Sequence, residues 1–536
     1  MNLPGLGSIS VLYLAEISLA AKSRSEVRGL SQNPAPIVVT ATQNYNGNDG
    51  PWSTFPVQIG NPPQVVEVLI STASEQTWAI LPQGCTDFDP PNCVELRGNE
   101  FNPNSSRTWT RNNVTSTGIF ELSLESELGY TGDGVYGYDT VQLGWPGSNG
   151  SSSNHQIVAG ISTKEFFLGI LGVNPRSTNF TTFDDPVPSF LSSLKQNKMI
   201  PSLSWSYTAG NQYRPGPFYG SLSLGGYDSS HFVPNNVSFA FSRIDLRDLT
   251  VIINDITMTT SNMSISFMAK AVSIPTFIDS TIPYLYLPLT ICEAFEDAFG
   301  LTWNDTVQAY LVNNSLHEAL QAQNPSVMFS LSSTNSSTEQ MVNISLPYAA
   351  FDLLAEYPLM INTTRYFPLM RAANKTQYTL GRTFLQEAYL IADYERHNFS
   401  VSQCSWDSRS SQHVVEIAPL EYNEEAELRH FPTGDIAGII VGSVIGLALA
   451  ASAVILRIRS VSKRTKATAS DVVKLPEKVE PVMLAAEADV GAELDDTMLR
   501  GHEMDGRANS KQNDGTKQQK NELPANECPA SELPHA

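Results

Sequence analysis

Basic residues are scarce in this sequence. Its 536 residues include 33 lysines and arginines against 54 aspartates and glutamates, which gives a formal net charge of −21 at pH 7. A protein that binds DNA or RNA needs a clustered basic face to neutralise the phosphates. The composition therefore argues against nucleic acid as a partner and is typical of a secreted protein that works in acidic surroundings.

Histidine and cysteine are also scarce. The eight histidines show no metal-ligand spacing, so we expect no metal and no cofactor. Cys85 and Cys93 bracket a proline-rich loop, and their spacing predicts a local disulfide. A second predicted disulfide joins Cys292 to Cys404, whereas Cys528 in the tail is expected to be a reduced thiol. The alternative is that these cysteines are buried free thiols.

One long uncharged run stands near the C-terminal end. Residues 436–456 are 21 uncharged residues, enough to span a hydrocarbon core as a helix. Basic residues follow the run directly, so the positive-inside rule places the C-terminus in the cytosol and the larger N-terminal part outside the cell or in a lumen. Gly438, Gly442 and Gly446 lie four residues apart and offer a face for a helix–helix dimer, although glycine is common in any membrane span.

The two ends of the chain predict processing and disorder. Residues 1–21 contain a mainly apolar run that ends in small residues, as in a signal peptide, although a misassigned start codon explains its uncharged beginning equally well. Residues 405–435 are a predicted polar stalk. Residues 457–536 are polar, poor in aromatics and predicted to be a disordered cytosolic tail.

Glycosylation acceptors of the form Asn-x-Ser/Thr are confined to the part of the chain before residue 400. This distribution is expected of a segment that faces a secretory lumen or the cell exterior. The acceptors are Asn104, Asn113, Asn149, Asn179, Asn236, Asn262, Asn304, Asn313, Asn335, Asn343, Asn362, Asn374 and Asn398.

The stretch from Ile37 to Cys404 has the pattern of an all-β protein. Short apolar runs alternate with turns rich in Asn, Gly, Pro and Ser. The segment Leu289–Phe299 is different, because its apolar residues recur at helical spacing and predict one helix with a core-facing stripe.

Two segments of this stretch share an unusual pattern. Val68–Ile80 reads VLISTASEQTWAI and Phe277–Pro288 reads FIDSTIPYLYLP. They resemble the two active-site loops of pepsin-like aspartic endopeptidases, in which an apolar strand leads to Asp-Thr/Ser-Gly. Six more segments resemble landmarks of that family in the family's order: Phe55–Gln64, Phe101–Trp109, Tyr136–Leu143, Gly169–Gly172, Gly220–Phe232 and Leu380–Val401.

The resemblance implies a bilobal pepsin-like (acid protease) fold, with an N-terminal β lobe at 37–226 and a C-terminal β lobe at 227–404. In architecture, the chain is most similar to a fungal branch of membrane-anchored members. Asp279 matches the second catalytic aspartate, whereas Ser71 stands at the position of the first. The glycines of the two loops correspond to Ala73 and Thr281.

The resemblance also implies which residues contact substrate. Thr72 and Ser280 match the hydroxyl residues that follow the two aspartates. The tyrosine of the family's flap is not clearly present, because the register places Glu127 at its position and Tyr130 three residues later. We therefore expect Thr72, Ser280, Glu127 and Tyr130 to line the substrate site.

The family's mechanism needs two carboxylates that share one proton, and a serine hydroxyl cannot replace one of them as a base. Neither loop contains a histidine, so a Ser-His-Asp triad has no support. The chain is thus predicted to be an impaired pseudoprotease that binds peptide or protein segments in its cleft and is anchored in the plasma membrane or another secretory-pathway membrane. The alternatives are an active endopeptidase that uses Asp279 and an unrecognised second acid, and a membrane-anchored scaffold or sensor. As candidate second acids, Glu67 and Glu75 are better explained as surface charges.

Overall fold

The computed structural model describes residues 34–180, 186–216, 218–244, 247–268, 272–333, 340–407 and 411–420. All of them belong to the first of two compact units, which spans Met1–Glu427. The predicted signal peptide, membrane span and tail lie outside the described residues. Among the residues that are described, no helix has both the length and the apolar character needed to cross a membrane.

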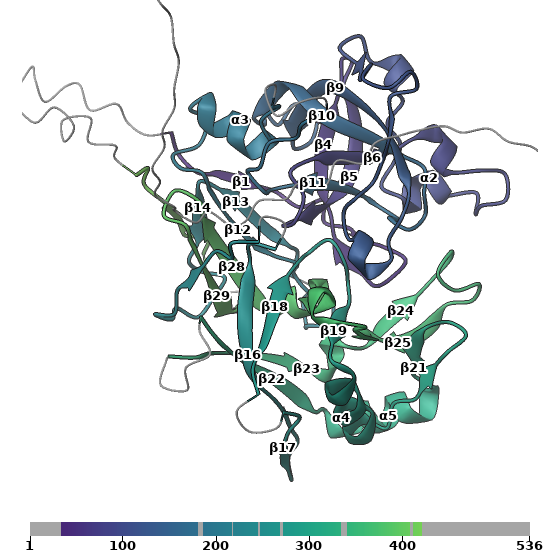
Figure 1. The fold of residues 1–536 in the computed structure, drawn as a ribbon, viewed down its shortest axis with the longest axis vertical. Helices are drawn as coiled ribbons and strands as arrows, with labels where there is room; N and C mark the ends of the chain where they lie inside the picture. The colour runs from purple at the N-terminus through teal and green to yellow at the C-terminus, as the bar shows by residue number, and fades with distance from the viewer. Residues whose placement is uncertain are drawn as a thin grey trace, which may run out of the picture. The chain divides into compact units, whose positions relative to one another are not determined.

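The N-terminal lobe is built on a sheet of eight strands (Figure 1). Seven lie in the order β10, β6, β11, β5, β4, β9 and β7, and β8 pairs with β9. β11 runs parallel to β5 between β5 and β6, so that Gly172 pairs with Ser71. The strands are β4 (Phe55–Ile59), β5 (Gln64–Ser71), β6 (Thr77–Ile80), β7 (Thr110–Arg111), β8 (Ile119–Glu121), β9 (Asp133–Leu143), β10 (Ser152–Ile161) and β11 (Gly169–Gly172).

A second sheet of eight strands forms the C-terminal lobe. Its order is β23, β22, β16, β18, β27, β19 and β26, and β17 pairs with β16. β27 lies between β18 and β19 and runs parallel to β18, as β11 does to β5. The strands are β16 (Thr250–Thr259), β17 (Ser264–Ser266), β18 (Ile274–Ile278), β19 (Leu285–Leu287), β22 (Ser326–Ser332), β23 (Val342–Pro347), β26 (Leu369–Arg371) and β27 (Thr379–Leu380).

Strands from both halves of the sequence form a third sheet of six strands, in the order β1, β13, β12, β28, β29 and β15. Because β12 pairs with β28, this sheet joins the first half of the chain to the second. The strands are β1 (Ile37–Val39), β12 (Ser204–Thr208), β13 (Ser221–Leu224), β15 (Phe239–Ala240), β28 (Ala388–Asp393) and β29 (Asn398–Gln403).

The remaining elements are short. The small sheets contain β2 (Tyr45–Asn46) with β3 (Trp52–Ser53), β14 (Gly226–Asp228) with β30 (Val414–Glu416), and β20 (Trp303–Asn304), β21 (Ala309–Leu311), β25 (Thr364–Phe367) and β24 (Leu353–Ala355) in that order. The α-helices are α2 (Cys93–Leu96), α3 (Phe190–Gln196), α4 (Leu289–Phe299), α5 (Asn314–Gln323) and α6 (Arg382–Leu385). The 3-10 helices are η2 (Pro82–Gly84), η3 (Pro103–Ser105), η4 (Ser126–Leu128), η5 (Tyr348–Ala350) and η6 (Lys375–Gln377).

Several sequence-based predictions can be compared with the elements of the structure. The mostly β architecture is confirmed, and α4 has the predicted bounds with Ile291, Phe295 and Phe299 buried. The stalk predicted for residues 405–435 is described at 405–407 and 411–420, and within it β30 pairs with β14. Val414–Glu416 therefore belong to a sheet of the folded domain.

The end of β5 is apolar without interruption over Val68–Ile70. Val66, Val68 and Ile70 belong to the main core, whereas Leu69 faces a second apolar cluster on the other side of the sheet. A strand covered on both faces is expected to be apolar throughout, since no side chain reaches water. The polar residues that begin at Ser71 thus mark the end of the strand.

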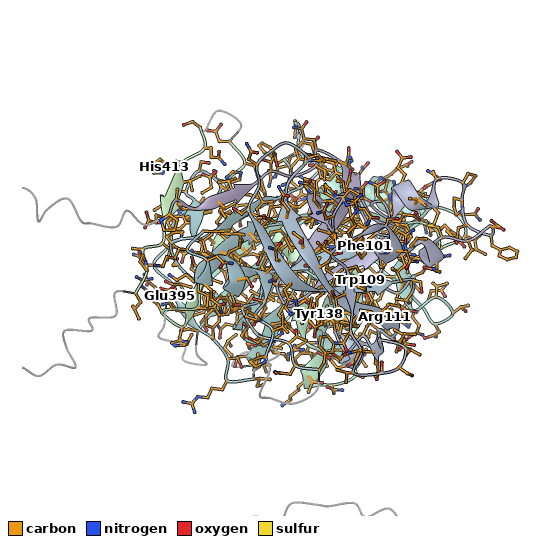
Figure 2. The ribbon with its side chains drawn as sticks, turned by 90° about the horizontal axis from the view of Figure 1, so that it is seen from above. Phe101, Trp109, Arg111, Tyr138, Glu395 and His413 are labelled. Atoms are coloured by element: carbon orange, nitrogen blue, oxygen red, sulfur yellow. A yellow bond between two sulfur atoms is a disulfide. The ribbon has the colours of Figure 1, made fainter. Side chains whose placement is uncertain are left out.

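The segment Phe101–Trp109 packs against the N-terminal sheet next to β9. The ring centres of Phe101 and Trp109, both labelled in Figure 2, lie 5.6 Å apart in an edge-to-face contact, and the Trp109 ring lies against Gly137 of β9. An aromatic pair in this geometry contributes about 0.5–1.5 kcal/mol beyond the area that it buries. This landmark is therefore part of the scaffold.

The predicted cysteine pairing is half right. Cys85 and Cys93 form a disulfide, which is confirmed. The predicted Cys292–Cys404 disulfide is wrong, because both residues are buried free thiols. Cys292 Sγ lies 3.5 Å from the carbonyl oxygen of Leu287, whereas Cys404 Sγ lies 3.3 Å from Thr208 Oγ1. The two thiols occupy different contacts, so no bond joins them.

Candidate active site

The two loops that resemble the active-site loops lie against each other. Ser71 ends β5 and Asp279 directly follows β18, and both residues are completely buried. Thr72 Oγ1 accepts a hydrogen bond from the Ser280 N–H at 3.0 Å, and Ser280 Oγ accepts one from the Thr72 N–H at 2.9 Å. Thr72 and Ser280, expected to line the substrate site, are thus buried residues that join the two lobes.

A glycine lies beneath each loop. A Cβ atom on Gly172 of β11 would lie 2.3 Å from the carbonyl oxygen of Ser74. A Cβ atom on Gly381, which follows β27, would lie 2.4 Å from the carbonyl oxygen of Tyr284. Contacts this short exclude any larger residue without a backbone shift. The two glycines therefore let the supporting strands pass close under the loops.

A threonine hydroxyl occupies the space between position 71 and the remaining acid. Thr281 Oγ1 lies 2.7 Å from Ser71 Oγ and 2.7 Å from Asp279 Oδ1. An ionised carboxylate only accepts hydrogen bonds, so Thr281 donates to Asp279 and Ser71 donates to Thr281. Asp279 Oδ1 also accepts from the Thr281 N–H at 2.8 Å, and Ser71 Oγ accepts from the Ser74 N–H at 3.0 Å. Thr281, which stands at the position of the glycine in the family's second active-site loop, thus fills this part of the site.

A second carboxyl group reaches Asp279 from the flap, the hairpin formed by β8 and β9. Glu125 lies in this hairpin directly before η4 and is only 4% exposed. Its backbone is left-handed, with φ 57° and ψ 23°, a conformation that costs a residue with a side chain about 1–3 kcal/mol and persists where the surroundings fix it. Glu125 Oε2 and Asp279 Oδ2 are both buried, and no donor among the described residues reaches either oxygen.

The surroundings of Glu125 favour its protonated form. Burial raises the pKa of Glu125 well above its ordinary value, and the negative charge of Asp279 and a hydrogen bond between the two carboxyls raise it further. Glu127 adds to this rise in the pKa of Glu125, whereas Arg247 opposes it. A proton on Glu125 supplies the hydrogen bond that the buried oxygens otherwise lack. Glu125 is therefore a neutral acid next to Asp279 at mildly acidic pH.

The tip of the flap rests on the C-terminal lobe. Glu127 Oε1 lies 3.4 Å from Arg247 Nη1, and the Glu127 carbonyl oxygen accepts a hydrogen bond of 2.5 Å from Gln377 Nε2. The Arg247 guanidinium lies over the ring of Phe277, 4.9 Å from its centre, at the strand that leads to Asp279. Glu127, expected to contact substrate, thus holds the flap across the cleft.

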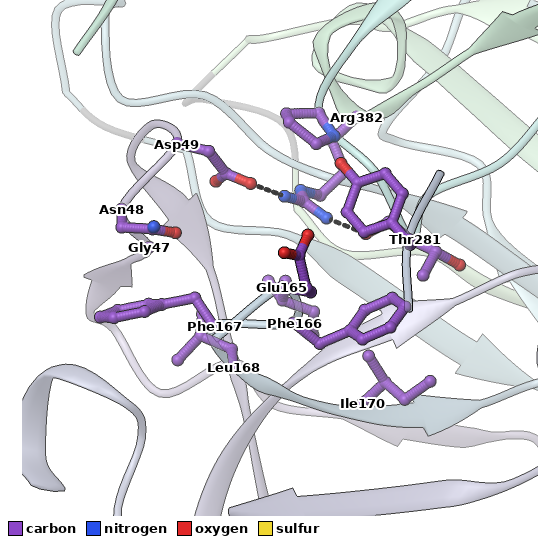
Figure 3. A pocket seen from close by; sticks show the side chains of 13 residues that line it. Gly47, Asn48, Asp49, Glu165, Phe166, Phe167, Leu168, Ile170, Thr281 and Arg382 are labelled. Atoms are coloured by element: carbon purple, nitrogen blue, oxygen red, sulfur yellow. Dashed lines mark hydrogen bonds and ion pairs between the residues drawn. The ribbon is translucent and has the colours of Figure 1, made fainter. Parts of the chain in front are cut away.

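A buried arginine supports the backbone of the second loop. Arg382 Nη1 donates to the carbonyl oxygens of Ser280 at 3.1 Å and Thr281 at 2.5 Å, and its Nη2 donates to Asp49 Oδ2 at 2.9 Å. Figure 3 shows this arginine between Asp49 and Thr281, beside a cavity of about 30 Å³. Tyr130, the other flap residue expected at the substrate site, lines the same cavity.

Two larger cavities lie along the flap. One of about 200 Å³ is lined by Ala73–Gln76 of the first loop and Ser123–Glu127 of the flap, together with Trp78, Tyr136 and Arg176. The other, of about 440 Å³, lies at Leu128–Tyr130 and includes residues of the C-terminal lobe such as Tyr286. No group of three or more metal-binding side chains converges within the described part of the chain.

The two acids first considered as replacements bind other residues. Glu75 Oε2 pairs with Arg176 Nη2 at 3.1 Å. Glu67 is buried, contrary to the expectation of a surface charge, and accepts hydrogen bonds from Asn46 Nδ2 at 2.7 Å and Thr54 Oγ1 at 3.3 Å. We did not identify Glu125 or Arg382 from the sequence. The only sequence signal for Glu125 is the run of acidic residues in the flap, which does not show which carboxyl points inward.

The raised pKa of Glu125 predicts a pH-dependent stability. Between the ordinary pKa of 4.5 and the raised folded-state pKa, the folded protein binds more protons at this residue than the unfolded chain does. This contribution to stability is therefore complete below pH 4.5 and is lost as the pH rises, by at most about 1.4 kcal/mol per pH unit. The Glu125→Gln variant, measured by urea unfolding at several pH values, should lose this dependence of the free energy of unfolding on pH. If the free energies of unfolding of the wild type and Glu125→Gln differ by the same amount at every pH, the assignment of the proton to Glu125 is contradicted.

The family match and the known proteins with similar sequences support the interpretation of the two loops as those of an aspartic protease. The sequence model of the family "Eukaryotic aspartyl protease" matches residues 54–404. Secreted aspartic protease 8 of Candida albicans is 23% identical over 368 residues, which cover 68% of this chain and 78% of that protein. The probable aspartic-type endopeptidase opsB of Aspergillus oryzae is 21% identical over 377 residues, which cover 67% of this chain and 70% of that protein. Pregnancy-associated glycoprotein 1 of Sus scrofa is 29% identical over 187 residues, which cover 33% of this chain and 41% of that protein.

Proposed function

Because the chain belongs to the eukaryotic aspartyl protease family, we propose that it is a catalytically impaired member whose cleft binds peptide or protein segments. The observation that carries this proposal is the hydrogen-bond chain from Ser71 through Thr281 to Asp279. It puts two hydroxyl groups where hydrolysis requires a second carboxylate and an accessible water.

The chemistry of these hydroxyls explains the expected impairment. Hydrolysis of a peptide bond by two carboxylates needs one of them to take a proton from water while the other donates to the substrate. Ser71 and Thr281 already donate their protons along the chain to Asp279, and neither hydroxyl is a base at acidic or neutral pH. Each group that assists proton transfer contributes about a hundred- to ten-thousand-fold to the rate, so losing one removes most of the activity.

Binding remains possible where catalysis is impaired. The cavities of about 200 Å³ and 440 Å³ along the flap offer space for side chains of an extended peptide. The flap strands and the loops also present backbone groups with which an extended chain pairs in the manner of an added strand. Peptide recognition therefore needs no second acid.

A second candidate function is favoured by Glu125. This carboxyl lies against Asp279, so the site contains two acids after all, although one comes from the flap. In that case Glu125 and Asp279 form an unusual acid pair and the protein is an active endopeptidase. The proposal of impairment is preferred because the Glu125 carboxyl is carried by the hairpin that covers the cleft, and not by the loop that faces Asp279.

We also propose that this domain faces the cell exterior or a secretory lumen and is anchored by residues 436–456. Twelve of the thirteen predicted glycosylation acceptors are described, and none of these twelve is buried. Exposed acceptors are what glycosylation requires. A role as a membrane-anchored scaffold or sensor is the remaining alternative, and it needs no ligand in the cleft.

The impairment is tested with the full-length protein and an unfolded protein substrate at acidic pH. We expect no cleavage above that of the Asp279→Asn variant, because that variant removes the acid that the family's mechanism needs. Glu125→Gln is the second control. Cleavage by the wild type that both substitutions abolish would reject the pseudoprotease proposal and establish the acid pair as catalytic.

A further inference from the structure

A cavity larger than those along the flap lies in the C-terminal lobe. It has a volume of about 560 Å³ and is lined by the first residues of β18 and α4, both labelled in Figure 1, and by the start of η6. It shares no lining residue with the two cavities along the flap, and it includes no residue of the two loops that meet at Ser71 and Asp279. This cavity is therefore separate from the proposed peptide-binding cleft.

The walls of the cavity are mainly apolar. Four of its lining residues are largely buried members of the main hydrophobic core: Phe267, Met268, Ile274 and Ile291. Val272 also lines the cavity and is 47% exposed, so the cavity opens at the surface. Protein cores rarely leave voids larger than a water molecule. Because water against apolar walls lacks hydrogen-bond partners, a cavity of this kind is suited to an apolar ligand.

The cavity also has a charge of one sign. Lys375, the first residue of η6, is exposed and is the one charged side chain among the described residues that line the cavity. No ion pair within the described part of the chain involves Lys375. A ligand that carries a carboxylate gains a charge-assisted hydrogen bond from an ammonium group, whereas a cationic ligand is repelled. The charge therefore selects an anionic end group.

We propose that this cavity binds a single aliphatic chain that ends in a carboxylate, as in a medium-chain fatty acid. The chain lies against the core residues, and the carboxylate pairs with the Lys375 ammonium group. The volume of about 560 Å³ falls within the range of about 300–1,000 Å³ that is usual for small-molecule sites. Binding is non-covalent. The inference does not depend on the proposed function, because none of the lining residues belongs to the cleft.

The test measures binding to the full-length protein in lipid nanodiscs by isothermal titration calorimetry at pH 7. Empty nanodiscs serve as the blank, so that partition of the ligand into lipid is subtracted. In the series octanoate, nonanoate and decanoate, each added methylene should tighten binding by about fourfold, the effect of burying one methylene group. Decyltrimethylammonium, which has the same chain as decanoate and the opposite charge, should bind at least about 10-fold more weakly.

Two substitutions locate the ligand. Lys375→Met keeps most of the side chain and the glycosylation acceptor at Asn374, but removes the charge, so it should weaken decanoate binding by about 10-fold. Lys198→Met, at an exposed lysine that lines none of the cavities described above, is the matched control and should leave binding unchanged. Thr290→Trp places an indole at an exposed position of the cavity wall and should abolish binding of both ligands.

Each other outcome overturns the proposal. Decanoate binding that does not exceed the blank, or equal binding of decanoate and decyltrimethylammonium, shows that the site does not take an anionic chain. Decanoate binding that both Lys375→Met and Thr290→Trp leave unchanged places the ligand elsewhere. If chemical crosslinking in the membrane shows a dimer of the wild type that Thr290→Trp dissociates, a second copy occupies the cavity. Thermal unfolding shows that the variants are folded, and the chain-length series on the wild type needs no variant.

Discussion

Replacing Ser71 by Asp, with Ala73 and Thr281 both replaced by Gly, should raise the rate of protein cleavage at acidic pH by about 100- to 10,000-fold over the wild type. The triple variant restores a carboxylate opposite Asp279. It also removes the hydroxyl of Thr281, which lies 2.7 Å from Ser71 Oγ and stands where the new carboxyl group must fit. The buried Ala73 methyl group leaves the first loop at the same time.

Two controls make this experiment specific. Ser71→Asp alone should remain close to the wild type, because the Thr281 side chain still occupies the space beside it. Ser71→Asn combined with the same two glycine substitutions should also remain inactive, since an amide has the shape of the carboxylate but cannot exchange the proton. If the triple variant cleaves no faster than this amide control, the impairment does not lie in the two loops.

Replacing Arg382 by Ala should lower the free energy of unfolding by about 3–5 kcal/mol, the range for breaking a buried ion pair by removal of one partner. Arg382 is only 2% exposed, and its loss leaves the Asp49 carboxylate and the carbonyl oxygens of Ser280 and Thr281 without their donor. Its guanidinium also lies over the ring of Trp52, 4.8 Å from the ring centre. The measurement is urea unfolding of the full-length protein, followed by tryptophan fluorescence.

Arg396 provides the matched control for this prediction. It pairs with Asp393 at 2.7 Å, but more than a third of its side chain is exposed. Exposed ion pairs contribute about 0–1 kcal/mol, because water screens them and the side chains lose freedom on pairing. Arg396→Ala should therefore change the free energy of unfolding by no more than about 1 kcal/mol. If Arg382→Ala and Arg396→Ala lower the free energy of unfolding equally, the burial of Arg382 does not increase its contribution to stability.

The sequence was sufficient for the fold because its signals are local. The apolar run that ends at Ser71 and the run that ends at Asp279 each mark the end of a buried strand. The helical spacing of Leu289–Phe299 arises within one element, and α4 has these bounds. Patterns of this kind are set by strand and helix geometry and do not depend on distant residues.

Features that depend on distant residues were missed. Arg382 and Asp49 are 333 positions apart, so no spacing rule connects them. The resemblance placed Glu127 at the position of the family's flap tyrosine, and it could not show that the left-handed turn at Glu125 brings that carboxyl to Asp279. The predicted Cys292–Cys404 disulfide failed for a related reason, since the positions of two cysteines in the sequence do not show whether their thiols face each other in the fold.

The reciprocal bonds between Thr72 and Ser280 use a hydroxyl and a backbone N–H from each loop, and neither bond involves position 71 or Asp279. These two bonds between the halves of the molecule are thus independent of the groups that perform chemistry, whereas the bond between Ser71 and Thr281 is not. Over generations, such a protein can exchange an acid for a serine, or a serine for an acid, while these two bonds stay in place. Loss of catalysis is then a small mutational step on one stable architecture, whereas its return also requires the two loop glycines.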